Sequence, residues 1–487
     1  MKVVFVASEA APIAKVGGLA DVVGSLPKAL TKLGIDVKIV IPKYGVISPE
    51  QFPQQFTFSD LEVFFNHKLE KFKVFKTLLP ATNIEVFLIE HPILSSNGVY
   101  LSTDATPEGV TDVSRFAFFS EAATLLLDEK FGEFDIIHCH DWHTAIIPDL
   151  IKVKFKPPHI LAKVAQVLTI HNLGVAYQGA ADPAILHLLD LKPESLPQIE
   201  ADIASGDINF LQQGIETADV LNTVSPQYAA EIQTQEFGGQ LAKILRKRET
   251  ILYGILNGID YEFFNPETDK NLVINYNNKS WSRGKAANKK ALEEKLGFAH
   301  DGKIMAGMVT RLDEQKGLDL VLQALSEFKS MGIKLAILGR GDPSIESKFG
   351  AFCQSNPQDV SCTFKFDPSL ANQIYAGSDI FIMPSKFEPC GLGQMISARY
   401  GTISVVRDVG GLHDTVEDGV TGFKFKEFNS SSLIGGVKRA LESFSNRQVW
   451  SKMVEAAIAK DFSWDRSAVE YVKLYEKALE VHNLLNI

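Results

Sequence analysis

The sequence contains little cysteine and no long apolar run, which argues against a disulfide-rich protein and a membrane-spanning protein. Only four cysteines occur among 487 residues, and none is part of a C-x-x-C pair. We therefore expect neither a disulfide framework nor a cysteine zinc site, and this usage favours a reducing cytoplasm. No apolar stretch is long enough to cross a bilayer, and the opening residues MKVVFVASEA read as a strand, not as a signal or transit peptide.

Positive charge is also in deficit. The 487 residues include 49 Lys and Arg against 59 Asp and Glu, which gives a formal net charge of −10. Nucleic acids and anionic membranes attract basic surfaces, so we expect neither as a partner of this chain. No low-complexity tract or short tandem repeat is apparent, and the length is typical of a globular protein with two or three domains.

What the chain does contain is an alternation of short apolar runs and amphipathic segments. KVVFVAS, DVKIVIP, FDIIHCH and AQVLTIH are typical of buried parallel strands, and the segments between such runs have helical spacing. The alternation restarts after residues 254–260. We therefore predict an α/β protein with two doubly wound, Rossmann-like domains, residues 1–253 and 254–461, which face a cleft. Residues 462–487 have helical spacing and end the chain.

Two glycine-rich turns, one near each end of the chain, follow apolar runs. Residues 15–22 read KVGGLADV, and residues 387–394 read FEPCGLGQ. Where a strand gives way to a helix, backbone N–H groups and the helix dipole favour an anion such as phosphate. Turns of this kind in both halves predict one ligand held by both domains. The competing interpretation of the first turn is a plain glycine turn with a solvated lysine.

Histidines and polar side chains follow two further apolar runs, at residues 138–143 (HCHDWH) and 168–172 (LTIHN). Two histidines on one face of a strand do not complete a metal site, so we predict no metal. Asp141 and its neighbours suit a sugar site better, because carboxylate and imidazole groups bond hydroxyls and an indole can cover a pyranose ring. We expect His138 to be a satisfied buried group and His171 to lie where a substrate binds.

The second half of the chain brings two cations and a carboxylate to the ends of apolar runs. Arg311 and Lys316 leave one run in a short turn, and two cations aimed at one place need an anion such as a diphosphate. The alternative is an exposed turn paired with neighbouring acids. Glu388 follows the run DIFIMPS, where a carboxylate would bind hydroxyls or carry acid–base chemistry. Cys390 has no evident histidine partner, so we interpret it as a small hydrophobe and not as a nucleophile.

Taken together, these motifs resemble those of the bacterial glycogen synthases and plant starch synthases. The strings KVGGLADVVGSLPKAL, HCHDWHTA, NTVSPQYAAEIQT, GILNGIDYEFFNP, RLDEQKGLDL and MPSKFEPCGLGQ match that family in its order. The match extends approximately from Val3 to Tyr475. The resemblance implies the two-domain glycosyltransferase fold called GT-B, in which the last helix crosses back onto the N-terminal domain.

The same resemblance implies the reaction. Enzymes of this family transfer glucose from ADP-glucose to the non-reducing end of an α-1,4-glucan and retain the anomeric configuration. We therefore expect ADP-glucose as the donor substrate, a glycogen or starch chain as the acceptor, and no cofactor or metal. The alternatives are a glucosyltransferase that uses UDP-glucose, a glucan-binding or initiating protein with low turnover, and a sugar-nucleotide epimerase of similar architecture.

Residue roles are carried over from the resemblance motif by motif. The two cations are expected to neutralise the donor diphosphate, the glutamate to hold the transferred glucose, and the histidine to bond the sugar near the reacting carbon: these catalytic residues are Arg311, Lys316, Glu388 and His171. The expected donor-binding residues are Lys15, Gly17, Gly18, Asn257, Cys390, Gly391 and Leu392. The expected acceptor or sugar-site residues are Asp141, Asn172, Glu9 and Asp21, and the ring expected to stack on the base is Phe366.

Some positions depart from the family pattern. Leu392–Gly393–Gln394 stands where family members often have LTQ, so a hydroxyl near the phosphates is missing. Gln212 and Gln213 replace a common lysine, and Ile396 removes the second glutamate of related glycosyltransferases. The segment after His171 is longer than the usual HNLAYQG. These differences concern fine specificity and not the reaction class.

Overall fold

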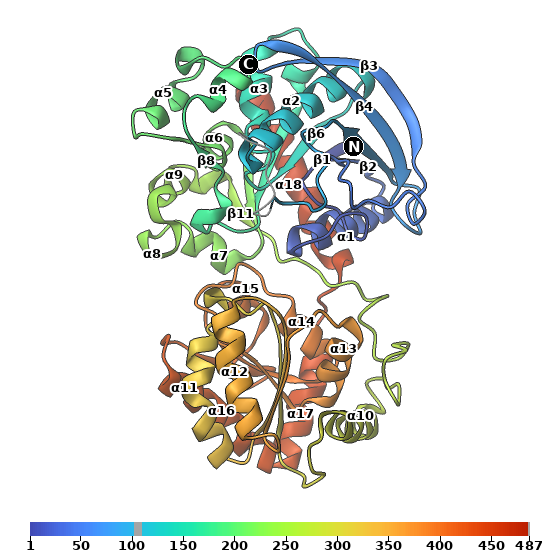
Figure 1. The fold of residues 1–487 in the computed structure, drawn as a ribbon, viewed down its shortest axis with the longest axis vertical. Coiled ribbons are helices and arrows are strands. Elements are labelled where there is room, and N and C mark those ends of the chain that lie inside the picture. The colour runs from blue at the N-terminus through green and yellow to red at the C-terminus, as the bar shows by residue number, and fades with distance from the viewer. Residues whose placement is uncertain (102–109, 486–487) are drawn as a thin grey trace. The chain divides into compact units, whose positions relative to one another are not determined.

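The computed structural model describes residues 1–101 and 110–485, which form two compact units. The first unit consists of Met1–Val224, Ala229–Gly258 and the C-terminal helix, and the second consists of Ser225–Tyr228 and Ile259–Ser463. Each unit is built on its own main β-sheet with helices packed against it (Figure 1).

The sheet of the first unit has nine strands, of which seven are parallel. Those seven are covered by helices, which explains why they read as apolar runs. In spatial order the strands are β11 (Leu252–Gly254), β10 (Val220–Thr223), β7 (Ala165–Ile170), β6 (Ile136–His140), β1 (Lys2–Val6), β2 (Asp36–Pro42), β5 (Glu85–Glu90), β4 (Lys68–Leu78) and β3 (Gln55–Phe65).

The hairpin of β3 and β4 is antiparallel and was not expected from the apolar runs. Both strands alternate between exposed and buried residues over much of their length. Such alternation is typical of strands with one face in water, so they contain no continuous apolar run.

Helices cover both faces of the parallel part of this sheet. The helices that pack on one face are α1 (Gly18–Lys32) and α18 (Trp464–Leu485), and those of the other face are α2 (Asp112–Lys130), α3 (Ile147–Lys154) and α6 (Phe210–Thr217). α18 follows the second unit in the chain but contacts α1, β7 and β10 of the first. Its buried residues recur at helical spacing: Trp464, Ala468, Tyr471, Tyr475 and Ala478. The expected return of the last helix is confirmed, although residues 486–487 lie outside the described part.

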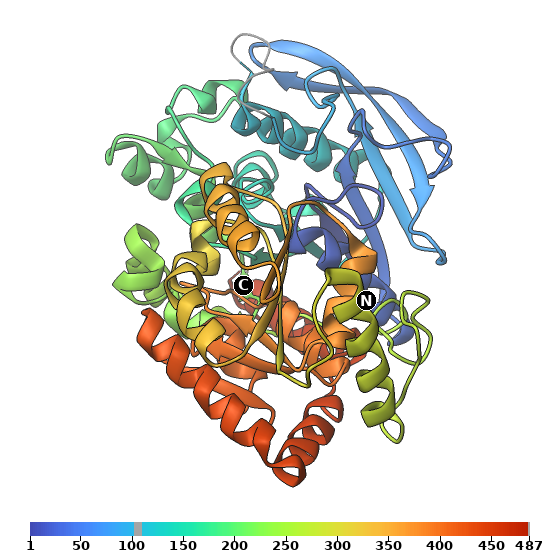
Figure 2. The same cartoon turned by 60° about the horizontal axis from the view of Figure 1, so that its bottom comes forward.

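The sheet of the second unit is entirely parallel. In spatial order its strands are β14 (Val360–Thr363), β13 (Lys334–Leu338), β12 (Met305–Val309), β15 (Ile380–Met383), β16 (Ile403–Arg407) and β17 (Gly422–Phe425). One face carries α11 (Leu318–Ser330), α12 (Pro343–Ser355) and α16 (Ser430–Ser445), and the other carries α10 (Trp281–Leu296), α13 (Pro368–Gly377), α14 (Gly393–Arg399) and α17 (Arg447–Ile458) (Figures 1 and 2). Two doubly wound α/β units confirm the predicted fold class.

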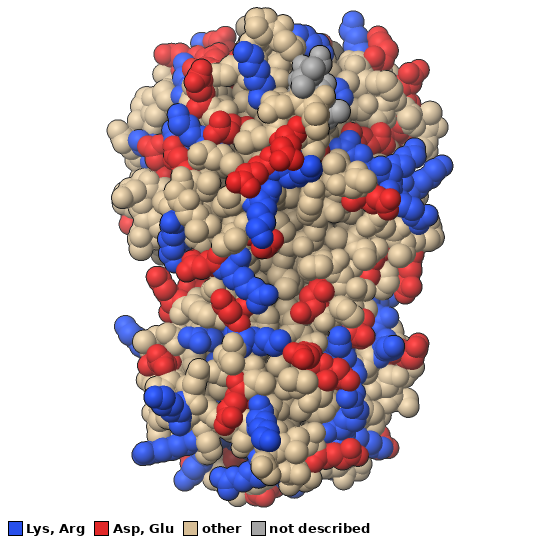
Figure 3. Space-filling view, turned by 180° about the vertical axis from the view of Figure 1, so that it is seen from behind, with Lys and Arg blue, Asp and Glu red and all other residues tan. Residues whose placement is uncertain are grey.

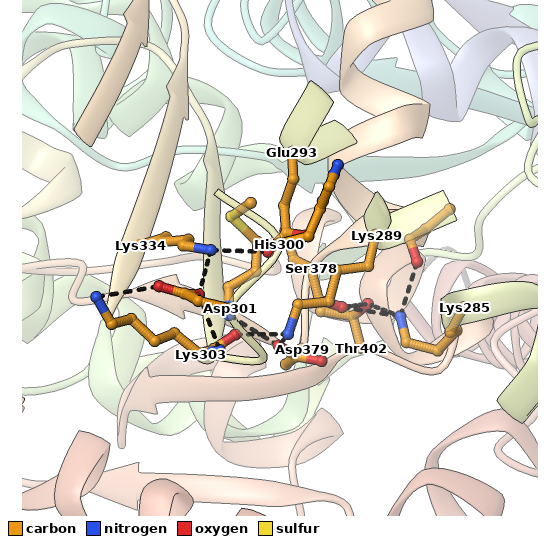
Figure 4. Close-up of polar contacts among 12 residues, drawn as sticks. Lys285, Lys289, Glu293, His300, Asp301, Lys303, Lys334, Ser378, Asp379 and Thr402 are labelled. Carbon is orange, nitrogen blue, oxygen red and sulfur yellow. Dashed lines mark hydrogen bonds and ion pairs between the residues drawn. The ribbon is translucent and has the colours of Figure 1, made fainter. Parts of the chain in front are cut away.

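Buried lysines attach α10 to this second sheet. Lys285 Nζ donates to Thr402 Oγ1 at 2.6 Å and to the carbonyl of Ser378 at 2.9 Å (Figure 4). Lys334 lies at the start of β13, and its Nζ is 3.0 Å from Oε1 of Glu293 in α10. Burial lowers the pKa of Lys285 to about 7, because a charged ammonium group is poorly solvated there, whereas the oxygen acceptors around it favour the charged form. Polar contacts therefore hold this helix as well as apolar packing.

The sequence predicted no disulfide framework, but the described residues contain one disulfide. Cys353 in α12 and Cys362 in β14 are joined by a disulfide, whereas Cys139 and Cys390 are buried and take no part in it. The bond joins a helix to the strand that follows it. A spacing of nine residues does not reveal by itself that the two Cα atoms lie 6.4 Å apart.

The surface shows no segregation of charge on the face drawn in Figure 3. Basic and acidic side chains of the described residues lie next to one another over most of that face. Across the described ranges 1–101 and 110–485, no helix is both long and apolar enough to cross a membrane.

Candidate active site

Most of the candidate residues follow the strands at which each sheet changes its direction of winding. In doubly wound sheets, ligands bind outside the carboxyl ends of the strands at that point. In the first unit the change lies between β1 and β6, and the segments 7–18 and 141–143 follow these strands. In the second unit it lies between β12 and β15, and the segments 310–317 and 384–392 follow. Each unit thus places polar candidates where its own topology favours a ligand.

Glu9 holds the first glycine turn in place. Its Oε2 accepts the backbone N–H of Val16 at 2.5 Å and that of Gly17 at 2.9 Å, and its Oε1 accepts the hydroxyl of Tyr100 at 2.5 Å. The glutamate is buried. Two backbone donors that the sequence assigned to a phosphate are therefore engaged by a carboxylate of the same chain.

The two glycines of this turn face open space. A Cβ atom at Gly17 or Gly18 would meet no protein atom within 4 Å, and neither residue has a positive φ. Nothing in the described chain thus requires glycine here, whereas a bare backbone permits close approach of a ligand. Beside them, Lys15 Nζ lies 2.5 Å from Asp21 Oδ1, with the side chains 48% and 32% exposed.

Asp141 directly follows β6 and has an unusual backbone conformation. Its φ of 55° lies in the left-handed region, which few residues other than glycine adopt, and such outliers cluster at functional sites. Its Oδ1 accepts the backbone N–H of His171 at 2.6 Å. Burial raises the pKa of Asp141 to about 8, because the ionised carboxylate is poorly solvated there.

His171 follows β7 and contacts a second histidine. Its Nε2 lies 3.0 Å from Nδ1 of His140, and burial lowers the pKa of His171 to about 3, so the ring is neutral. The neighbouring Asn172 uses its Oδ1 to accept the N–H of Gly174 at 2.9 Å, which closes a local turn. The structure thus brings Asp141 and His171 into direct contact, and Asn172 follows them in the chain.

Two other residues of the HCHDWH motif are structural. Trp142 is 6% exposed and packs edge-on against Phe116. A Cβ atom at Gly179 would lie 2.3 Å from the indole, so this ring is core and offers no open face to a sugar. His138 is fully buried and hydrogen-bonded through both ring nitrogens, which confirms the expectation of a satisfied buried histidine.

In the second unit, Lys316 and Glu388 form a close ion pair between the loops after β12 and β15. The ammonium nitrogen lies 3.0 Å and 2.8 Å from the two carboxylate oxygens, and Ser385 Oγ donates to one of them at 2.8 Å. Gly317 allows this approach: its φ is 64°, and a Cβ atom would lie 2.0 Å from the carbonyl oxygen of Pro384. The ammonium group of Lys316 and the carboxylate of Glu388 are therefore held in fixed positions before any ligand binds.

The other predicted residues of this side differ in exposure. Arg311 is 57% exposed and lies 3.4 Å from Asp313, so the two cations of this turn have different surroundings. Phe366 is 87% exposed. Asn257, which belongs to the first unit, is buried, and its Oδ1 has no hydrogen-bond partner among the residues that the structure describes.

Two glycines that sequence reasoning did not single out shape the turn at Glu388. The N–H of Gly411 donates to the carbonyl of Glu388 at 3.0 Å, and a Cβ atom at Gly410 would lie 1.9 Å from the same oxygen. Ser225 Oγ donates to the carbonyl of Pro389 at 2.6 Å. The string VGGL was visible in the sequence, but its contact with a turn about twenty residues earlier was not.

The remaining donor-side candidates form the rest of that turn. Cys390 is buried, Gly391 has a φ of 73°, and Leu392 precedes α14. Within the described ranges, no group of three or more His, Cys, Asp or Glu side chains could hold a metal ion.

Comparison with known sequences identifies the family. Residues 2–247 match the family described as the starch synthase catalytic domain, and residues 288–456 match glycosyl transferases group 1. The chain is 43% identical to the glycogen synthase of Thermosipho melanesiensis and 43% identical to that of Thermotoga maritima. Each alignment covers 98% of this chain and 99% of the relative.

Comparison with solved structures agrees. The catalytic domain of starch synthase IV from Arabidopsis thaliana, bound to ADP and acarbose, matches with a TM-score of 0.89 and 35% identity over 98% of this chain and 99% of that one. Sucrose-phosphate synthase from Thermosynechococcus elongatus, at 16% identity and a TM-score of 0.62, shares the fold alone. The GT-B fold and glycosyltransferase activity expected from the sequence are confirmed, and the chain belongs to the glycogen and starch synthase family.

Proposed function

We propose that this enzyme transfers glucose from ADP-glucose to the terminal 4-hydroxyl of an α-1,4-glucan and retains the anomeric configuration. Family membership supports the reaction class. The observation that carries the proposal is the pair of Lys316 and Glu388 at the winding change of the second sheet, where a cation and a carboxylate can hold the diphosphate and the sugar of one donor.

The diphosphate is the group whose charge grows most as ADP leaves, so its stabilisation should dominate the rate. Lys316 can supply a third N–H while two remain on Glu388, and Arg311 adds a second cation from the same turn. Lys15 is the matching cation of the first unit. The backbone N–H groups of Val16 and Gly17 already donate to Glu9, so the ammonium group of Lys15 is the main contact that this turn offers to an anion.

The acceptor needs polar and aromatic side chains, and the first unit supplies them beside Tyr100. A pocket of about 740 Å³ opens there. Polar groups suited to sugar hydroxyls share its wall with Tyr100, and they include Asn66, Lys68, Glu70, His91 and Asn97. We propose that Asp141 and Asn172 act closer to the reacting carbon. Phe366, with its open ring, is the proposed stacking partner of the base.

Retention without a covalent intermediate fits the state of the carboxyl groups. A double displacement needs an ionised nucleophile on the sugar face opposite the leaving group. Burial raises the pKa of Asp141 and so disfavours its ionised form, and both oxygens of Glu388 are engaged. We propose that the acceptor attacks on the same face from which ADP departs, with the leaving phosphate taking its proton.

Nucleotide release with glycogen present tests the donor assignment. We expect ADP release from ADP-glucose in proportion to chain growth, and far slower UDP release from UDP-glucose. Faster turnover of UDP-glucose than of ADP-glucose would show that UDP-glucose is the donor. Release without chain growth would refute transfer, and binding of glycogen without turnover of either nucleotide would favour a glucan-binding protein.

Lysine substitutions test the residue roles. Lys316→Ala and Lys15→Ala should each lower kcat at least about tenfold, which is about 1.4 kcal/mol of transition-state stabilisation. Lys290→Ala, an exposed lysine on α10, is the matched control. Loss of acceptor affinity alone, with kcat intact, would refute the assignment to the diphosphate.

A further inference from the structure

Three histidines lie in a row behind the candidate sugar site of the first unit. His138 and His140 belong to β6, and His171 follows the neighbouring β7. The ring centroids of His138 and His140 are 4.2 Å apart, and those of His140 and His171 are 5.3 Å apart with nearly parallel planes. The only hydrogen bond between rings that the structure describes in this row joins His140 Nδ1 to His171 Nε2 at 3.0 Å.

The environment decides which ring donates. Burial lowers the pKa of His140 and of His171, so both rings are neutral and each has a single N–H. Nε2 of His140 is buried and has no hydrogen-bond partner in the described part of the chain. A proton on that atom would be an orphaned buried donor, which proteins rarely tolerate. The proton of His140 therefore belongs on Nδ1, where Nε2 of His171 accepts it.

It follows that the single proton of His171 is on Nδ1. We propose that His140 is a positioning residue: its Nδ1–H fixes the tautomer of His171, so that His171 presents Nδ1–H as a hydrogen-bond donor to the transferred glucose. This inference rests on the proposed function, because it assumes that His171 contacts the sugar. In the opposite tautomer, His171 could only accept a hydrogen bond at Nδ1.

The surroundings of His140 keep its ring from turning. Its ring packs against those of Phe5 and His138, with centroids 5.0 Å and 4.2 Å away. Its backbone N–H donates to Thr144 Oγ1 at 2.8 Å. His138 is itself tied to the C-terminal helix, because its Nδ1 lies 3.0 Å from the hydroxyl of Tyr475 in α18. The helix that returns from the second unit thus supports the ring that orients His171.

Two substitutions of His140 separate donation from packing. The amide nitrogen of asparagine can take the place of Nδ1, so His140→Asn keeps a donor to His171, whereas His140→Leu fills similar space without one. We expect His140→Leu to lower kcat at least about tenfold, as loss of one aimed donor does in other enzymes, with a smaller change in KM for ADP-glucose. His140→Asn should stay within about threefold of the parent, since it restores that donor.

Tautomers can be read directly by NMR of the full-length protein with ¹⁵N-labelled histidine, the His171 signal being assigned by its loss in His171→Gln. We expect Nδ1–H at His171 in the parent and in His140→Asn, and a shift toward Nε2–H in His140→Leu. Nε2–H in the parent would overturn the proposal. So would equal kcat losses in folded His140→Asn and His140→Leu, or full activity of His140→Leu.

The NMR result needs no substrate, so it distinguishes failure of this inference from failure of the proposed function. If the parent shows Nδ1–H but does not turn over ADP-glucose, the proposed function fails, and with it the role of the donor toward glucose. Thermal unfolding of both variants identifies a mere folding defect. If His140→Leu does not fold, the tautomer of the parent and the activity of His140→Asn still decide the proposal.

Discussion

At the scale of single residues, the glycines of the first turn offer a sharp separation of function from stability. Gly18 is the first residue of α1 and has open space at its Cβ position. Alanine is a better helix residue than glycine, so Gly18→Ala should leave the melting temperature unchanged or raise it. If a ligand needs the bare backbone, the same substitution should lower kcat/KM for ADP-glucose at least about tenfold, or about 1.4 kcal/mol.

Gly435 in α16 provides the matched control. It also has open space at its Cβ position, and it lies on a helix away from the winding change. Gly435→Ala should leave the kinetics unchanged. Equal kinetic effects of the two substitutions, or a fall in melting temperature for Gly18→Ala that accounts for its lost activity, would remove the argument for a ligand at this turn.

The buried carboxyl of Asp141 predicts a pH dependence of stability. Its pKa is about 8 in the folded protein against an ordinary value of 3.8, so between these pH values the folded state binds more protons than the unfolded state. The free energy of unfolding contributed by this group must therefore fall as pH rises from 4 to 8.

Asp141→Asn removes this titration but keeps the size of the side chain. Relative to the parent, the variant should gain at least about 1 kcal/mol between pH 5 and pH 8, because one pKa unit corresponds to about 1.4 kcal/mol. Denaturant unfolding at a series of pH values measures the difference, in which the other titrating groups cancel. A difference that stays constant with pH would show that the carboxyl is ionised throughout.

At the scale of elements, α10 depends on a polar anchor. Lys285 Nζ lies within 3.4 Å of four oxygen atoms on the segments before β15 and β16, which share its three N–H groups. Lys285→Met would keep the apolar stem but remove the ammonium donor from these buried oxygens, of which the carbonyls of Ser378 and Tyr400 keep a hydroxyl donor. We expect it to lower the free energy of unfolding by about 1–3 kcal/mol.

The control for this helix is Lys290→Met, since Lys290 is exposed on the same helix. It should change stability by less than about 0.5 kcal/mol. Because the anchor lies at the amino ends of the strands, opposite to Lys316 and Glu388, the folded Lys285→Met enzyme should keep its kcat. A stable Lys285→Met protein would mean that apolar packing alone holds α10.

At the scale of the whole molecule, the proposed donor contacts come from both units. Lys15 belongs to the first unit, and Lys316 and Glu388 belong to the second. Groups on separate units can act on one diphosphate only if the units approach each other. We expect a smaller radius of gyration by small-angle scattering when ADP or ADP-glucose saturates the enzyme.

A Lys15→Ala and Lys316→Ala double variant serves as the reference for this measurement, because it should lose the contacts that draw the units together. Its scattering profile should not change at the same nucleotide concentration. An unchanged profile of the parent enzyme at saturation would contradict closure by the donor alone.

The local pattern of the chain by itself determined the α/β class, the two-unit organisation, the last helix and the family. An apolar run can be read from neighbouring residues alone, and it indicates a strand that is buried on both faces. The sequence pattern also predicted that candidate catalytic and binding residues lie at strand ends, as Asp141, His171 and Glu388 do. The hairpin of β3 and β4 was not predicted, because one of its faces is in water and its sequence therefore contains no continuous apolar run.

Only the tertiary structure decided which of these residues touch. His140 meets His171 because β6 and β7 are neighbours in a register that pairs His140 with Thr169. Lys316 meets Glu388 because β12 and β15 lie side by side although 72 residues separate the pair. Winding order and register are set by packing of the whole sheet, and contacts between distant side chains follow from them and not from local spacing.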